Sequence, residues 1–260
     1  MARGIRPKLG RTRQGQAPTP ATRPRFWGRH AVIAALANPE RIVRKISGTR
    51  EALGAIDLPP GLQIVYSDVA DLGRMVPHDA PHQGLVIDVD PLEDVWLGDV
   101  LQQGQDDERP LLLLDQVTDP HNVGAIIRSA AAFNALAIIT QDRHSPPESG
   151  TIARSASGML EIVPWVRVVN LSRALDEIGE AGFWRVGLAG EAEMTLDQAL
   201  NPGKVALVLG AEGEGMRHNT AAHCDALARL PISEQVESLN VSNAAAISLY
   251  AISVRSGGKP

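Results

Sequence analysis

Unbroken runs of hydrophobic residues alternate along the chain with segments in which hydrophobic residues recur every three or four positions. This alternation predicts strands followed by helices. Short unbroken apolar runs, typical of strands that are covered on both faces, occur at residues 111–114 and 205–209. From residue 122 to 133 the apolar residues recur every three or four positions, which is typical of an amphipathic helix. Further strands are expected at 137–140, 162–163, 184–188 and 226–230, and further helices at 148–157, 171–181 and 239–254. Strands that alternate with helices predict an α/β domain with a mostly parallel sheet.

Residues 26–90 show the same alternation on a smaller scale. The expected elements are a helix that ends at Asn38-Pro39 and strands at 42–47, 63–66 and 85–89. A polar run at 102–109 then separates this segment from the apolar run at 111. The sequence therefore predicts a small α/β domain at 26–90, a linker at 91–109 and a larger α/β domain at 110–260.

In the larger domain three polar loops each follow a predicted strand, at 115–122, 210–215 and 231–238. In a parallel sheet, ligands bind beyond the carboxyl ends of the strands, so these loops are expected to contribute to a site. In the first loop, Asn122 is a candidate cap for the helix that follows. Arg128 stands on a helix face otherwise made of Gly and Ala, which a ligand, a backbone or a second subunit could approach closely.

The second loop combines three glycines with two glutamates. It does not match the dinucleotide fingerprint, and the lysine of the P-loop is absent, which argues against a nucleotide-dependent oxidoreductase. Its glycines would let the backbone approach a flat or bulky ligand, and Glu212 offers a carboxylate beside it. A tight turn without a ligand is the alternative explanation of the glycines.

The third loop leads into a cluster of hydroxyl and amide side chains, Ser238, Asn240, Ser242 and Asn243. Ser238 or Asn240 could cap the last helix, which is the usual reason for such residues before an Ala-rich run. One cap does not require four polar side chains, so a binding role is also expected. No metal site is expected, because His218 and His223 have no cluster of partner ligands in the sequence.

The net charge of −5 is unevenly distributed, with +11 in residues 1–50 and −16 in the remainder. Residues 1–25 are rich in Arg, Pro and Gly and are expected to be a disordered arm that binds a polyanion. A mitochondrial transit peptide is the alternative, although such peptides are rich in Ser and none precedes Ser47. The single cysteine, Cys224, excludes an internal disulfide framework and fits a reducing compartment. Because no apolar run is long enough to cross a bilayer, a cytoplasmic protein without membrane attachment is expected.

Three segments resemble, in order and spacing, the signature motifs of the SpoU (TrmH) class of SPOUT RNA 2′-O-ribose methyltransferases. They are DQVTDPHNVGAIIRSAAAF from residue 115, LVLGAEGEGM from residue 207 and LPISEQVESLNVSNAAAISLYA from residue 230. The segment FWGRHAVIAALANPERIVRKI, from residue 26, resembles the ribosomal-protein-like substrate-binding domain of many members. Within the class, residues 170–196 and 221–227 look closest to the RlmB branch, which methylates a guanosine ribose of 23S ribosomal RNA.

The resemblance implies a catalytic domain with a deep C-terminal trefoil knot, S-adenosylmethionine as cofactor and a homodimer with the active site at its interface. By position, the catalytic residues of the class fall on Asn122, Arg128, Glu212, Ser238 and Asn240. Its cofactor contacts fall on Gly210, Leu230 and Leu239, largely through backbone groups. The implied substrate is a guanosine of large-subunit ribosomal RNA, with transfer RNA as the alternative.

The chain departs from the pattern of the class at a few positions. Asn134 stands where a Gly is common, residues 233–235 replace the usual Met and Gly, and Ala251 replaces a Glu of the last helix. Glu234 adds an acid on the RNA and cofactor side, which leaves the choice of substrate open. A binding or ribosome-assembly protein on the same fold is the alternative to an enzyme. Because all five matched catalytic residues are present, the sequence favours the enzyme.

Overall fold

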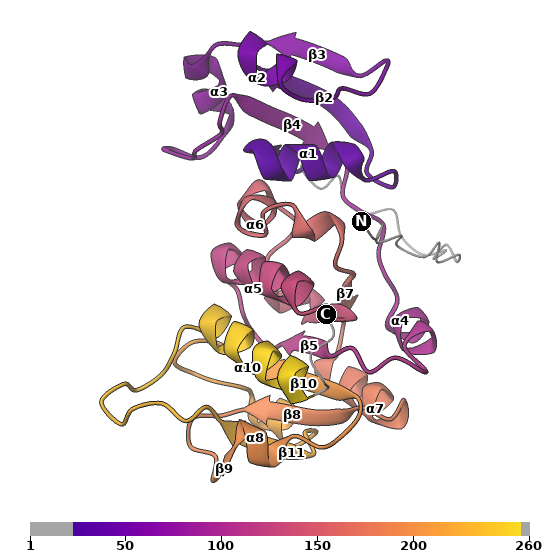
Figure 1. Ribbon diagram of the computed structural model, residues 1–260, viewed down its shortest axis with the longest axis vertical. Coiled ribbons are helices and arrows are strands. Elements are labelled where there is room, and N and C mark those ends of the chain that lie inside the picture. The colour runs from indigo at the N-terminus through magenta and orange to yellow at the C-terminus, as the bar shows by residue number, and fades with distance from the viewer. Residues whose placement is uncertain (1–22, 256–260) are drawn as a thin grey trace. The chain divides into compact units, whose positions relative to one another are not determined.

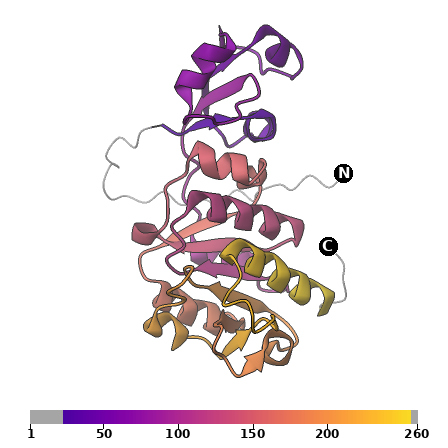
Figure 2. The ribbon, with the colours of Figure 1, turned by 90° about the vertical axis from the view of Figure 1, so that its left-hand side faces the viewer.

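The computed structural model describes residues 23–255, which form two compact units (Figures 1 and 2). The first unit takes in residues up to 93 together with 147–162, and the second takes in 94–146 together with residues from 163 onward. Most of the predicted basic arm, residues 1–22, lies outside the described residues. Within the described part of the chain, no helix is both long and apolar enough to span a membrane.

The sheet of the second unit has seven parallel strands in the order β7-β6-β5-β10-β8-β11-β9. The strands are β5 (Leu111–Leu114), β6 (Ala137–Gln141), β7 (Trp165–Val168), β8 (Trp184–Leu188), β9 (Met194–Thr195), β10 (Val205–Leu209) and β11 (Ala226–Arg229). The helices are α4 (Leu97–Gln103), α5 (Pro120–Ala132), α7 (Leu171–Glu180), α8 (Leu196–Ala199), α9 (His218–Ala221) and α10 (Val241–Arg255), with a 3-10 turn η1 (Asp142–His144). The α/β class and the parallel sheet predicted from the sequence are therefore confirmed, while the trefoil knot stays a prediction.

The four leucines of β5 explain how this unit is layered. All four are buried, and successive side chains of a strand point to opposite faces, so both faces of the sheet must be covered. Leu111 and Leu113 belong to a core cluster with residues of α4 and α7. On the other side α5 and α10 pack against each other, and both contact strands (Figure 1). The continuous apolar run thus reflects a strand in the middle of a three-layer unit.

The first unit is a smaller α/β layer whose four strands follow the order β1-β4-β2-β3. Its strands are β1 (Arg25–Trp27), β2 (Val43–Gly48), β3 (Gln63–Tyr66) and β4 (Leu85–Val89). Its helices are α1 (Arg29–Ala37), α2 (Arg50–Gly54), α3 (Val69–Met75) and α6 (Gly150–Ser155), with a 3-10 turn η2 (Met159–Glu161). Only the β2–β3 pair is parallel, whereas β4 runs antiparallel to both β1 and β2.

Residues 147–162, which the sequence assigned to the larger domain, pack with the first unit. Arg41, whose side chain is 0% exposed, binds carboxylates of Glu148 at 2.5 Å and Glu161 at 2.7 Å. At Gly150, a Cβ atom would lie 2.0 Å from the ring of Trp27, so α6 reaches β1 only because this position has no side chain. The hydrophobic pattern locates a helix here but does not say which sheet it covers.

Two other local expectations differ from the structure. The predicted linker contains α4, which contributes Leu97 and Val100 to the core of the second unit. The strand expected at 162–163 lies instead at β7, because Ile162 follows the turn η2 and is exposed. Asn134, which the resemblance places where the class commonly has Gly, has a φ of 53° just after α5. Asn tolerates this left-handed conformation better than most side chains, so the replacement keeps the helix end intact.

Candidate functional site

Side chains in or directly after the three polar loops meet beyond the carboxyl ends of β5, β10 and β11. The Nδ2 group of Asn122 donates to Oε1 of Glu212 at 3.4 Å, although the two residues are 90 positions apart. Asn240 donates through its own Nδ2 to Oδ1 of Asn122 at 3.0 Å and also to Glu212. Three of the five expected catalytic residues thus form one hydrogen-bonded cluster, although their catalytic roles stay predictions.

Asn122 does not cap α5, contrary to the expectation from the sequence. The cap is Asp119, whose carboxylate accepts from the backbone N–H of His121 at 3.0 Å, with Pro120 at the first helical position. Asn122 therefore lies inside the first turn, and its amide is free to contact Glu212 rather than its own backbone. The Asp-Pro pair was the signal for this cap, because Pro favours the first position of a helix.

Asn240 does cap α10, as one of the expectations proposed. Its Oδ1 accepts from the backbone N–H of Ser242 at 2.9 Å. The same amide binds Asn122 through its nitrogen, so capping and site formation use the two ends of one side chain. The backbone N–H of Val241, the first residue of α10, donates to Glu212 Oε1 at 3.2 Å. A carboxylate at a helix N-terminus is favourable because it meets unpaired N–H groups and the positive end of the helix dipole.

The glycine loop, residues 210–216, is a closed hairpin that carries Glu212 at its tip. Ala211 and Gly215 exchange both backbone hydrogen bonds, at 3.0 and 3.1 Å. A Cβ atom on Gly210 would lie 2.1 Å from the backbone of Gly215, so the loop folds back over this glycine. Gly213 has a φ of 81°, which residues with side chains rarely adopt. The glycines are therefore required by the loop itself.

A pocket of about 670 Å³ lies against this hairpin. Gly210, Glu212, Ser238 and Leu239 are among its lining residues, whereas Leu230 is not among those the described chain contributes. Its volume falls within the usual range of roughly 300–1,000 Å³ for small-ligand and cofactor pockets. Two of the three expected cofactor contacts thus lie at the pocket, together with one expected catalytic hydroxyl.

Arg128 is exposed on α5 and has no hydrogen bond or ion pair to any residue between 23 and 255. Six residues separate it from Asn122, so along an α-helix it lies about 9 Å farther on and about a third of a turn away. The guanidinium is therefore available to a group outside the chain, and it does not join the cluster around Glu212.

Asp115 and Arg217 form a contact that the sequence did not single out. Asp115 is fully buried at the end of β5, and its Oδ1 lies 2.6 Å from Nη2 of Arg217. The backbone N–H of Arg217 donates to the second carboxylate oxygen at 3.0 Å. Asp followed by a polar turn, directly after four buried leucines, was the signal, because a buried carboxylate needs a partner.

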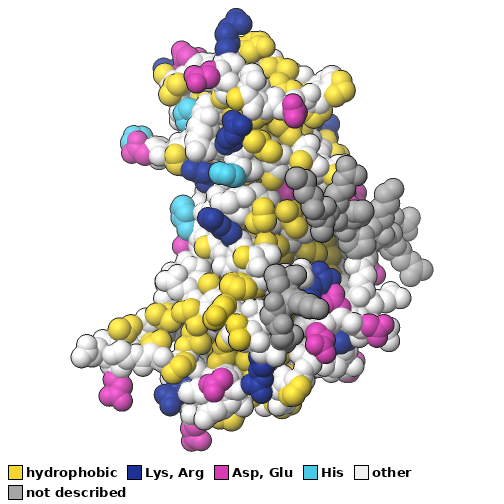
Figure 3. Space-filling view, viewed as in Figure 1, with side chains coloured by type: hydrophobic (Ala, Val, Ile, Leu, Met, Phe, Trp, Pro, Cys, Tyr) yellow, Lys and Arg dark blue, Asp and Glu magenta, His cyan; other side chains and the backbone are white. Residues whose placement is uncertain are grey.

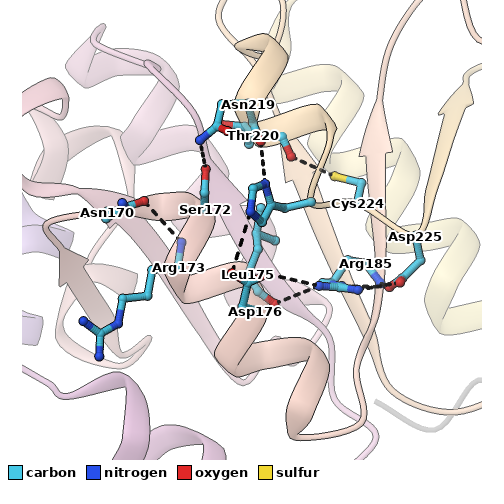
Figure 4. Close-up of polar contacts among 11 residues, drawn as sticks. Asn170, Ser172, Arg173, Leu175, Asp176, Arg185, Asn219, Thr220, Cys224 and Asp225 are labelled. Atoms are coloured by element: carbon cyan, nitrogen blue, oxygen red, sulfur yellow. Dashed lines mark hydrogen bonds and ion pairs between the residues drawn. The ribbon is translucent and has the colours of Figure 1, made fainter.

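A second polar network joins α7, α9 and β8 (Figure 4). Arg185 donates to both oxygens of Asp225 and lies 3.9 Å from Asp176. The hydrogen bond to Arg185 holds the pKa of Asp225 below its ordinary value, while burial raises the pKa of the nearby Cys224 thiol to about 12. These groups bind one another, and the described residues contain no cluster of three or more His, Cys, Asp or Glu able to hold a metal.

Known proteins with similar sequences show which family this chain belongs to. The model of the SpoU rRNA methylase family matches residues 109–250. The 23S rRNA (guanosine-2′-O-)-methyltransferase RlmB of Pseudomonas aeruginosa is 45% identical over 88% of this chain and 95% of its own length. RlmB of Vibrio parahaemolyticus is 39% identical over 86% of this chain and 94% of its own. An uncharacterised tRNA/rRNA methyltransferase of Synechocystis is 38% identical, and the match spans 61% of that protein.

Solved structures agree with the sequence matches. A TrmH-family protein from Porphyromonas gingivalis has a TM-score of 0.72 and 28% identity, with 89% of each chain covered. The SpoU methyltransferase AviRb from Streptomyces viridochromogenes, in complex with AdoMet, has a TM-score of 0.72 and shares the fold at 24% identity over 90% and 91% of the two chains. With the family model covering more than half of the sequence, the chain belongs to the SpoU rRNA methylase family.

Proposed function

We propose that this protein transfers a methyl group from S-adenosylmethionine to a ribose 2′-hydroxyl of RNA, and that the target is a guanosine of 23S ribosomal RNA. The observation that carries the proposal is the cluster of Asn122, Glu212 and Asn240 beside the pocket. The target is supported by the RlmB relatives, which match nearly their whole length. A transfer RNA substrate is the alternative.

The pocket suits the cofactor in size and in charge. Glu191, Glu212, Glu214 and Glu237 line it, and no Lys or Arg is among the described lining residues. Acidic walls are favourable for a ligand that carries a sulfonium and an ammonium group. Gly210 and Leu239 would contact it chiefly through backbone groups, as glycine permits close approach. When bound, the cofactor supplies a methyl group that is already activated and needs no metal.

The residues of the chain then have to position the ribose and handle its proton. Glu212 Oε1 already accepts hydrogen bonds from Asn122, Asn240 and Val241, so it acts as an organiser of the loops rather than as a free base. Arg128 has no partner among the described residues, and its role in the proposal is to bind an RNA phosphate and stabilise the developing alkoxide. A guanidinium normally stays protonated, which favours this role over proton removal.

A second copy of the chain would complete the site. Within one chain Arg128 and Asn122 point in different directions around α5, so the Arg128 guanidinium would reach the pocket of a second subunit rather than that of its own. The stripe Ile247, Tyr250 and Val254 leaves apolar side chains of α10 exposed, with Tyr250 at 60%, and hydrophobic groups gather over this helix in Figure 3. Such a patch is typical of an interface. Tyr250→Glu should give monomers in sedimentation velocity and should abolish methyl transfer while leaving the fold intact.

The decisive test is a methyl-transfer assay with labelled S-adenosylmethionine on transcripts of 23S rRNA and transfer RNA, followed by mapping of 2′-O-methyl sites. The proposal expects one guanosine of the 23S transcript to be modified, with or without chelator. Modification of transfer RNA alone would replace the substrate. RNA binding without turnover on either transcript would favour the assembly-protein alternative.

A further inference from the structure

We propose that Asp115 and Arg217 are a positioning pair that fixes the glycine loop, residues 210–216, and acts on methyl transfer through Glu212. The inference rests on the proposed function, since it concerns the same site. Neither residue is among those that the resemblance to the SpoU class marks as catalytic. Their role follows from three observations: the burial of the Asp115 carboxylate, the attachment of Asp115 to both ends of the loop, and the place of Glu212 at the loop's tip.

The pair is built from three contacts between two residues. Arg217 donates through Nε to Oδ1 of Asp115 at 2.8 Å, its Nη2 lies 2.6 Å from the same oxygen, and its backbone N–H donates to Oδ2 at 3.0 Å. The side chain of Asp115 is 0% exposed, whereas that of Arg217 is 36% exposed. A buried carboxylate bound by one residue through both side chain and backbone fixes that residue in position and orientation.

Asp115 holds the loop at both of its ends. Its own backbone N–H donates to the carbonyl of Leu209 at 2.8 Å, the residue before the loop, and its carboxylate binds Arg217, the residue after it. Between these points the hairpin is closed by Ala211 and Gly215. The backbone of Asp115 therefore holds the start of the hairpin against β5, as part of the strand ladder, and its buried carboxylate holds the end of the hairpin through Arg217.

The glycines explain why such an attachment is needed. Gly213 and Gly215 have positive φ angles, and glycine has the most conformational freedom to lose on ordering. The tip residue Glu212 must nevertheless lie within hydrogen-bond distance of Asn122, which lies in the first turn of α5, directly after the loop that begins with Asp115. The Asp115–Arg217 pair thus fixes the position of the motif that begins at residue 207 relative to the motif that begins at residue 115. A small shift of the glycine loop would separate Glu212 from Asn122 and change the shape of the pocket.

A double-mutant cycle tests this coupling. Arg217→Ala alone should lower the single-turnover rate about 10- to 100-fold and weaken S-adenosylmethionine binding, measured by calorimetry, about tenfold, as expected when catalytic groups are displaced by about 1 Å. In a Glu212→Ala background the same change should cost less than about threefold in either quantity, because residues acting through one another are not additive. Arg217→Lys, which keeps a side-chain cation beside the Asp115 carboxylate, should recover part of the affinity that Arg217→Ala loses.

Arg185→Ala is the matched control, since Arg185 makes a similar side-chain and backbone pair with Asp225 in the same sheet but away from the loop. It should lower the melting temperature, leave cofactor affinity unchanged and act additively with Glu212→Ala. The positioning role would be overturned if the effects of Arg217→Ala and Glu212→Ala were additive. It would also be overturned if Arg217→Ala lowered the melting temperature without changing the rate or the cofactor affinity.

Amide hydrogen exchange separates this inference from the proposed function. If the wild-type protein binds no S-adenosylmethionine, the function fails, yet residues 210–217 should still exchange faster in Arg217→Ala or Arg217→Lys and not in Arg185→Ala. Unchanged exchange of that loop in both Arg217 variants would overturn the pair as a positioning device, whatever the activity of the wild type.

Discussion

Arg41 and Glu148 lie 2.5 Å apart inside the first unit although 107 positions separate them in the chain. Glu161 binds the same guanidinium, and Asn38 donates to Glu161 at 2.7 Å. The ring of Phe26 lies 5.1 Å from the guanidinium carbon, so the cation is enclosed on several sides. Residues 147–162 lie between β6 and β7 in the sequence but belong to the first unit. The buried contacts of Arg41 with Glu148 and Glu161 hold this segment in the first unit.

Removal of Arg41 should therefore destabilise the first unit strongly. Arg41→Ala leaves two carboxylates buried without their cation, and breaking such a pair from one side costs about 3–5 kcal/mol. Urea unfolding followed by tryptophan fluorescence measures the loss, since Trp27 lies in this unit. The control is Arg44→Ala, because Arg44 is about half exposed in its pair with Asp90, and an ion pair screened by solvent contributes little to stability. Equal losses of unfolding free energy in the two variants would contradict a stabilising role of the buried Arg41 contacts.

Glu148 should make the stability of this unit fall as the pH rises above 4.5. Burial raises the pKa of Glu148 above its ordinary value of 4.5, and the neighbouring Glu161 adds to the rise while Arg41 opposes it. The folded state therefore holds the proton more tightly, so the contribution of Glu148 is complete below the unfolded pKa and is lost as the pH passes the folded one.

Glu148→Gln tests this sign, because the amide stays neutral at every pH and retains an acceptor for the backbone N–H of Leu92. Between pH 4 and 8 the wild type should lose unfolding free energy relative to the variant. A gap that is constant with pH, or that moves in the opposite direction, would show that ionisation of Glu148 is not costly in the folded protein.

Arg128 should be needed for methyl transfer and not for folding. It is exposed and unpaired among the described residues, so Arg128→Ala should keep the melting temperature and cofactor affinity while transfer falls about a hundredfold or more. Arg128→Lys should recover little, since Lys lacks the planar fork that binds phosphate through two N–H groups. Arg173→Ala, another exposed arginine of the same unit, should retain wild-type rates. An active Arg128→Ala protein would remove this residue from the mechanism.

Cys224 should react slowly with alkylating reagents. Burial raises the pKa of its thiol to about 12, so at pH 8 only about one molecule in ten thousand carries the reactive thiolate. Iodoacetamide should leave Cys224 unmodified in the folded protein, as read by mass spectrometry, and modify it rapidly in urea. Rapid labelling of the folded protein would show that the segment around α9 opens readily.

Local patterns in the sequence determined several strands and helices of this protein, and its family. Unbroken apolar runs are buried strands at β5 and β10, because a strand covered on both faces has no polar side to show. Helix α5 follows from the apolar spacing of its residues. The three motifs also placed the chain in its family, since residue order and spacing survive when overall identity falls.

Only the tertiary structure decided how distant residues combine. The pattern of residues 147–162 predicts a helix, but Arg41, which contributes the buried cation, decides that this helix covers the first unit. Likewise Asp115 and Arg217, 102 positions apart, read separately as ordinary turn and surface residues. Buried charges are stable only when paired, and the partner is chosen by the route of the chain through space rather than by its neighbours in sequence.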